Sequence, residues 1–225
     1  MKKNLSFNNA KKIFGTWLKD KDFLSTHNNR IYLQDHGFYL TVFEISPLHN
    51  SGFVLDMGIK FMWSSYYGIS YDYSDCDTRV CSGYSFNAGM GAVFFDDANI
   101  GDEINLLKAD AIKKIESYKE IENFETFKYK IENRDDFAKR ANPGFEKRDV
   151  SLAIIKMFTE DRVSAEKILD EGAIKNPVAL RLSKNDISKE VFRNELIAII
   201  NECRSAMSDE HCIDLPPITQ LWKTL

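Results

Sequence analysis

Acidic side chains gather where the chain reads FFDDANIGDEIN, which places Asp96, Asp97, Asp102 and Glu103 around a glycine. Carboxylate oxygens collected on one loop are the ligands that hard cations such as Ca²⁺ prefer. The spacing differs from the calcium-loop pattern D-x-[DN]-x-[DN]-G-x₅-E. Asp102 and Glu103 also suit the first turn of a helix, where the helix dipole favours negative charge. Two interpretations therefore stand: a solvated helix start, or the acidic loop of a metal-assisted enzyme.

Three histidines, His27, His36 and His49, fall in expected loops between the first helix and a long strand. Imidazole is the side chain most often used for general acid–base catalysis near neutral pH. The fold could bring one of them beside Glu44 or Asp56, which would orient the ring. Otherwise the three rings are solvated loop residues.

The cysteines are Cys76, Cys81, Cys203 and Cys212, and they form no Cys-x-x-Cys pair. His211 is adjacent to Cys212, but one such pair does not make a zinc ligand set. The chain also lacks a P-loop, a G-x-S-x-G elbow and an H-E-x-x-H helix. We therefore expect free thiols, no bound metal and no cofactor, and we assign no catalytic residue.

Aromatic residues and then aspartates are concentrated in the segment from 63 to 77, here named the tyrosine–aspartate segment. Its candidate contact residues are Trp63, Tyr66, Tyr67, Tyr71, Asp72, Tyr73, Asp75 and Asp77. Tyrosines joined by serine and glycine provide large contact areas at low entropic cost, as in antibody paratopes. The aspartates could steer a basic partner onto this surface. Alternatively, the tyrosines pack on a sheet and the rest lie at its edge.

The composition is that of an ordinary globular protein of 225 residues, with 44% hydrophobic residues and a net charge of −4. Without a basic stripe, broad electrostatic binding to nucleic acid is not expected. The first residues carry two lysines but no apolar run, and no stretch approaches the ~18 apolar residues of a membrane span. The sequence therefore predicts a cytoplasmic protein that binds neither nucleic acid nor membrane.

The first hundred residues hold most of the aromatic residues and glycines, and this part should be rich in strands. A helix is expected over 8–20, capped by Asn8 or Asn9. Alternating hydrophobicity and turn residues then indicate strands over 30–34, 38–46, 53–63, 78–86 and 91–95. A turn at Asp35-His36-Gly37 joins the first two strands, because glycine tolerates positive φ.

Beyond residue 100 the hydrophobic period becomes helical. Helices are expected over 102–121, 122–140, 146–160, 161–173 and 186–207. Asp186 is the expected cap of the last helix, and Pro216 and Pro217 prevent regular helix after it. The predicted fold is α+β: an N-terminal helix packed on an antiparallel sheet, followed by a mostly helical C-terminal half. Residues 1–100 and 101–225 should share a core.

The N-terminal third resembles a loose class of uncharacterised bacterial α+β domains. The likeness lies in Phe23 after the helix, in the strand 38–46 leading to Pro47, and in the strand 52–63 ending at Trp63. Some of these domains are immunity proteins encoded beside polymorphic toxins. The resemblance implies a non-enzymatic binding protein that occludes a partner, such as a basic toxin domain, and it carries over no catalytic residue.

Overall fold

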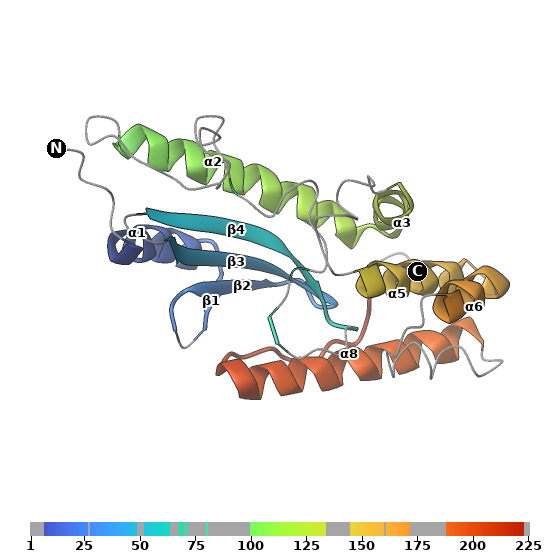
Figure 1. The fold of residues 1–225 in the computed structure, drawn as a ribbon. Helices are drawn as coiled ribbons and strands as arrows, with labels where there is room; N and C mark the ends of the chain where they lie inside the picture. Colours follow the sequence, from blue (N-terminus) through green and yellow to red (C-terminus); the bar gives the residue numbers. More distant parts are fainter. Residues whose placement is uncertain are drawn as a thin grey trace.

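In the computed structural model, the residues described are 7–26, 28–48, 52–63, 68–69, 71, 80, 100–133, 145–159, 161–171 and 188–222. They form one antiparallel sheet with helices around it (Figure 1). The fold is α+β, as predicted: an N-terminal helix, a sheet, and then a mostly helical C-terminal half. Within the described ranges, none of the helices combines the length and the apolar character that a bilayer crossing needs.

The sheet has four described strands in the order β1-β2-β3-β4. They are β1 (Leu24–Ser25), β2 (Ile31–Asp35), β3 (Tyr39–Leu48) and β4 (Gly52–Phe61). Each strand pairs antiparallel with the next along the chain, so short hairpin connections suffice. The three longer strands match the predicted alternation, whereas β1 has only two residues and carries no alternation.

One sheet face packs against α1 (Phe7–Lys19) and α2 (Ile100–Lys119). Phe14 of α1 contacts Phe43 and Phe53, with ring centroids 6.4 and 6.0 Å apart. On the α2 side, the Tyr118 hydroxyl donates to the carbonyl of Met57 in β4. These aromatic contacts bury the alternating apolar residues of β3 and β4, which is the main stabilisation available to a sheet face.

The predicted cap of the first helix is wrong, because α1 already includes Asn8 and Asn9. For the last helix, α8 (Lys189–His211), the cap is Ser188 and not Asp186. The Ser188 Oγ accepts the backbone N–H of Val191. Short polar residues near a helix start are all plausible caps in sequence, and only the backbone geometry selects one.

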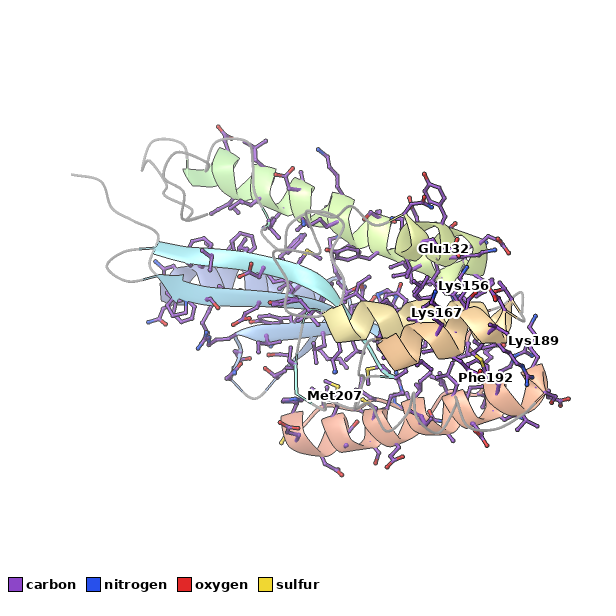
Figure 2. The ribbon with its side chains drawn as sticks, turned by 45° about the vertical axis from the view of Figure 1, so that its right-hand side comes forward. Glu132, Lys156, Lys167, Lys189, Phe192 and Met207 are labelled. Atoms are coloured by element: carbon purple, nitrogen blue, oxygen red, sulfur yellow. The ribbon has the colours of Figure 1, made fainter. Side chains whose placement is uncertain are left out.

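The helical half begins with α2 and a 3₁₀ turn, η1 (Glu120–Glu122). Its other described helices are α3 (Phe124–Glu132), α5 (Phe145–Phe158), α6 (Arg162–Glu171) and α8. In Figure 2, Lys156 of α5 lies beside Glu132 of α3, and their charged groups are 3.1 Å apart. Phe192 of α8 packs edge-on against Phe158 of α5 at 4.9 Å between centroids. One buried cluster contains residues of both sequence halves.

α2 and α8 run on opposite sides of the sheet (Figure 1). After α8 the chain continues without regular structure through residues 213–222, here named the C-terminal strap. The side chain of Asn201 makes two hydrogen bonds with the backbone of Ile218 in the strap: its Nδ2 donates to the carbonyl, and its Oδ1 accepts from the N–H. At its end, buried Trp222 donates from Nε1 to the carbonyl of Ile121. The strap is therefore packed against the fold.

Candidate binding cleft

A cleft of about 410 Å³ opens between the β2–β3 turn, η1 and the C-terminal strap. It is lined by Asp35, His36, Gly37, Phe38, Glu122, Pro217, Ile218, Thr219, Gln220 and Leu221. The three walls come from distant parts of the sequence. Only tertiary packing brings them together, so no local pattern could have indicated this cleft.

The turn wall is shaped by Gly37, whose φ is +86°. A residue with a Cβ rarely adopts this conformation, which explains the glycine after Asp35-His36. The Gly37 N–H donates to the Asp35 carboxylate at 2.9 Å and closes the turn locally. The turn predicted at this place, with Gly37 at positive φ, is thus confirmed.

Arg204 of α8 ties this turn to the strap. Its guanidinium donates to both carboxylate oxygens of Asp35, at 2.7 and 2.6 Å, and to the carbonyls of Gly37 and Pro216, both at 2.7 Å. The Arg204 side chain is 1% exposed. These four hydrogen bonds use four of the five N–H donors of the guanidinium, whereas a lysine ammonium has only three donors. Two walls of the cleft are therefore held in a fixed relation.

His36 and Glu122 form a hydrogen-bonded pair at the back of the cleft. The Nδ1 of His36 lies 3.0 Å from Glu122 Oε1, and Nε2 lies 3.1 Å from the Thr41 hydroxyl. The imidazole stacks on the Tyr39 ring at 4.4 Å and is 7% exposed. Burial lowers the pKa of His36, and the hydrogen bond to Glu122 opposes this effect only in part. The ring is therefore neutral near pH 7.

The neutral ring fixes the direction of these hydrogen bonds. A carboxylate accepts only, so His36 donates from Nδ1 to Glu122, and Nε2 accepts from the Thr41 hydroxyl. The Tyr39 hydroxyl donates toward the Tyr118 carbonyl at 3.2 Å and toward Glu122 Oε1 at 3.4 Å. Burial and the nearby Glu122 charge raise the pKa of Tyr39, which stays protonated as this donor role requires.

This carboxylate–imidazole–hydroxyl series has the order of groups used in acyl transfer. The hydroxyl here belongs to Thr41, however, which is fully buried. A substrate carbonyl would have to reach an atom inside the core, so the arrangement orients Glu122 and does not expose a nucleophile. Glu122 itself is 47% exposed and lines the cleft.

Only two residues of the tyrosine–aspartate segment's candidate set are described, and both contact the protein itself. Trp63 is 1% exposed; it stacks on Phe61 at 4.7 Å and donates from Nε1 to the Ser151 hydroxyl. Its assignment to an exposed contact surface is therefore wrong, because the ring is part of the core. The Tyr71 hydroxyl donates to Glu44 Oε2 at 3.1 Å. Tyr66, Tyr67, Asp72, Tyr73, Asp75 and Asp77 lie outside the described residues.

The other predicted groups are also placed in part. Asp102 is exposed in the first turn of α2, whereas Asp96, Asp97 and the Glu103 side chain lie outside the described residues. Among the described residues no cluster of three or more His, Cys, Asp and Glu could hold a metal ion. Glu44 pairs with Arg30 at 3.5 Å, and no histidine of the described residues contacts it.

His36 meets Glu122, which lies 86 positions away, and not Glu44 or Asp56. Sequence reasoning missed this partner, although the Asp-His-Gly turn indicated where the ring would lie. His27, His49, Cys76 and Cys81 are outside the described residues. Of the described cysteines, Cys203 is buried and Cys212 is exposed, and no disulfide joins them.

Comparison of the chain with protein-family models, with curated proteins and with solved structures finds no match.

Proposed function

We propose that this chain is a non-enzymatic binding protein that holds a protein partner in the cleft between the β2–β3 turn, η1 and the C-terminal strap. The observation that carries the proposal is the state of the polar groups there. His36, Thr41 and Arg204 hydrogen-bond to other groups of the protein, while Glu122 presents a half-exposed carboxylate to the cleft. Such a site offers oriented charge and shape for recognition, and no open nucleophile.

The kind of partner follows from charge. The chain carries −4 overall, and η1 contributes Glu120 and Glu122, which are 58% and 47% exposed. Glu120 pairs with Lys130 at 3.0 Å, so Glu122 is the η1 carboxylate whose charge faces the cleft. A basic partner would be attracted to this side of the molecule. The resemblance of the N-terminal third to immunity domains suggests a basic toxin domain, occluded by binding, as one such partner. The tyrosine–aspartate segment, apart from Trp63, is a second predicted contact region.

The test is affinity capture of the tagged protein from its native cells, followed by mass spectrometry and by reconstitution with the purified partner. Three variants are compared with the unaltered chain. Glu122→Lys reverses the cleft charge, and Glu125→Lys is the control, an exposed residue of α3 outside the cleft. The third variant reverses Asp72, Asp75 and Asp77 together.

A stoichiometric partner that is lost with Glu122→Lys and kept with Glu125→Lys supports binding at the cleft. Loss with the triple reversal alone moves the contact to the tyrosine–aspartate segment. If no protein binds the unaltered chain, the binding function is refuted. In that case a rise in melting temperature with Ca²⁺ or Mg²⁺, abolished by substitutions at Asp96 and Asp97, would favour the metal-assisted alternative.

A further inference from the structure

We propose that the cleft is a receptor for a single lysine side chain presented on an extended segment of a partner protein. The inference rests on the proposed binding function and names the chemistry that the site recognises. Three features carry it: the orientation of the Glu122 carboxylate, the apolar walls beside it, and the backbone of the C-terminal strap.

Glu122 is held in one orientation before any ligand arrives. Its Oε1 is approached by two donors, His36 Nδ1 at 3.0 Å and the Tyr39 hydroxyl at 3.4 Å. Within the described part of the chain Oε2 accepts no hydrogen bond. Pre-organisation of this kind removes part of the entropic cost of ordering a flexible glutamate on binding. The carboxylate therefore presents one open oxygen to the cleft.

One open oxygen favours an ammonium over a guanidinium. Arginine gains most when its fork meets both oxygens of a carboxylate. At Glu122 the donors of His36 and Tyr39 already meet Oε1, so a guanidinium could use only one arm. A lysine ammonium is a compact point charge that needs a single oxygen and completes its other hydrogen bonds with water or carbonyls.

The remaining lining suits the stem of a lysine and the chain that carries it. Ile218 and Leu221, both half-buried, give apolar surface on which the methylene groups of lysine can pack. In the strap, Asn201 fixes Ile218, whereas no hydrogen bond among the described residues engages the backbone of Thr219 or Gln220. These exposed backbone groups can pair with an extended peptide. A partner segment fits this combination better than a free amine does.

The experiment is an NMR titration of the ¹⁵N-labelled full chain with four probes. The probes are the capped tripeptide Ala-Lys-Ala, its arginine and norleucine analogues, and n-butylammonium. We expect the lysine peptide to shift the amide signals of Gly37, Thr219 and Gln220. The arginine peptide should bind several-fold more weakly, the norleucine peptide should give no shift, and n-butylammonium should bind more weakly than the lysine peptide.

Glu122→Gln keeps the acceptor for His36 and Tyr39 but removes the charge, and should weaken lysine-peptide binding about tenfold. Glu125→Gln, exposed on α3, is the matched control and should bind as the unaltered chain does. If Glu122→Gln disturbs signals far from the cleft, Glu122→Asp replaces it: it keeps the charge but is one methylene shorter, and it should also bind more weakly.

Several results would overturn the inference: no shift at the cleft with the lysine peptide, unchanged affinity in Glu122→Gln, or arginine binding at least as tightly as lysine. Equal affinity for n-butylammonium would make the cleft a small-amine site and overturn the peptide receptor. The binding function fails separately, because it is refuted only when the unaltered chain captures no partner. A partner captured equally by Glu122→Gln would overturn the lysine site alone.

Discussion

Replacing Arg204 by methionine should destabilise the whole fold, because this one side chain joins the sheet, α8 and the C-terminal strap. The guanidinium satisfies the Asp35 carboxylate and the carbonyls of Gly37 and Pro216 at distances of 2.6 to 2.7 Å. Methionine fills much of the space but donates no hydrogen bond. The substitution therefore leaves an anion and two carbonyls without their donor.

The size of the effect follows from burial. Removing one partner of a buried ion pair costs about 3–5 kcal/mol. Asp35 is 25% exposed and retains the Gly37 N–H as a donor, so water and this bond replace part of what is lost. The expected loss in the free energy of unfolding is thus about 3 kcal/mol, the lower end of that range. For a chain of this size this lowers the melting temperature by about 6–12 °C.

The assay is urea unfolding followed by tryptophan fluorescence, with calorimetry for the melting temperature. Arg193→Met is the matched control on the same helix. The half-buried Arg193 side chain makes no hydrogen bond or ion pair among the described residues, so its effect should stay within about 0.5 kcal/mol. The double variant with Asp35→Asn should lose less than the sum of the two single losses. If Arg204→Met is no more destabilising than Arg193→Met, the hydrogen bonds of Arg204 do not contribute substantially to the stability of the fold.

Three further perturbations test other parts of the structure. Burial holds the pKa of His36 below its ordinary value, so the unfolded chain binds a proton at this residue before the folded chain does as the pH falls below about 6.5. This difference makes the folded chain less stable at acidic pH, and His36→Asn should therefore reduce the loss of unfolding free energy between pH 7 and pH 5. An unchanged pH profile would contradict this. Trp63→Ala should cost about 3–5 kcal/mol in urea unfolding if the ring is in the core, and about 0.5 kcal/mol or less if it lies on a contact surface. Gly15→Ala should lower the melting temperature although alanine is the better helix former, because its Cβ would overlap the Tyr32 hydroxyl; Tyr32→Phe should restore part of the loss, and a Gly15→Ala variant as stable as the unaltered chain would refute the contact.

Much of the fold could be predicted because its signals are local. The alternation from Phe53 to Phe61 gives β4, and the glycine of the Asp-His-Gly turn gives the β2–β3 corner. Side-chain periodicity and a required positive φ depend only on neighbouring residues, so both can be recognised in a short stretch of sequence without knowledge of the rest of the chain. The α+β class followed from the change of period near residue 100.

Other predictions failed because the local sequence was equally compatible with more than one helix cap or with more than one role for an aromatic residue. Ser188 and Asp186 are both acceptable helix caps, and the backbone at Ser188 decided between them. Trp63 has the composition of a contact residue, but its ring is buried by stacking on Phe38 and Phe61 and by packing against Phe127. Aromatic residues are common both in interfaces and in cores, so type and spacing alone do not separate the two.

The sequence by itself determined many of the described elements: helices, the three longer strands and the turn that carries His36. It did not indicate β1, and the strands predicted over 78–86 and 91–95 lie outside the described residues except for Val80. The tertiary structure alone decided which distant groups meet, since His36 contacts Glu122 and Asp35 receives Arg204 from 169 positions away. The reason is physical. Helices and strands form from short-range backbone preferences, whereas a cleft depends on how the buried faces of these elements pack. One amino-acid sequence does not indicate which distant residues that packing brings into contact.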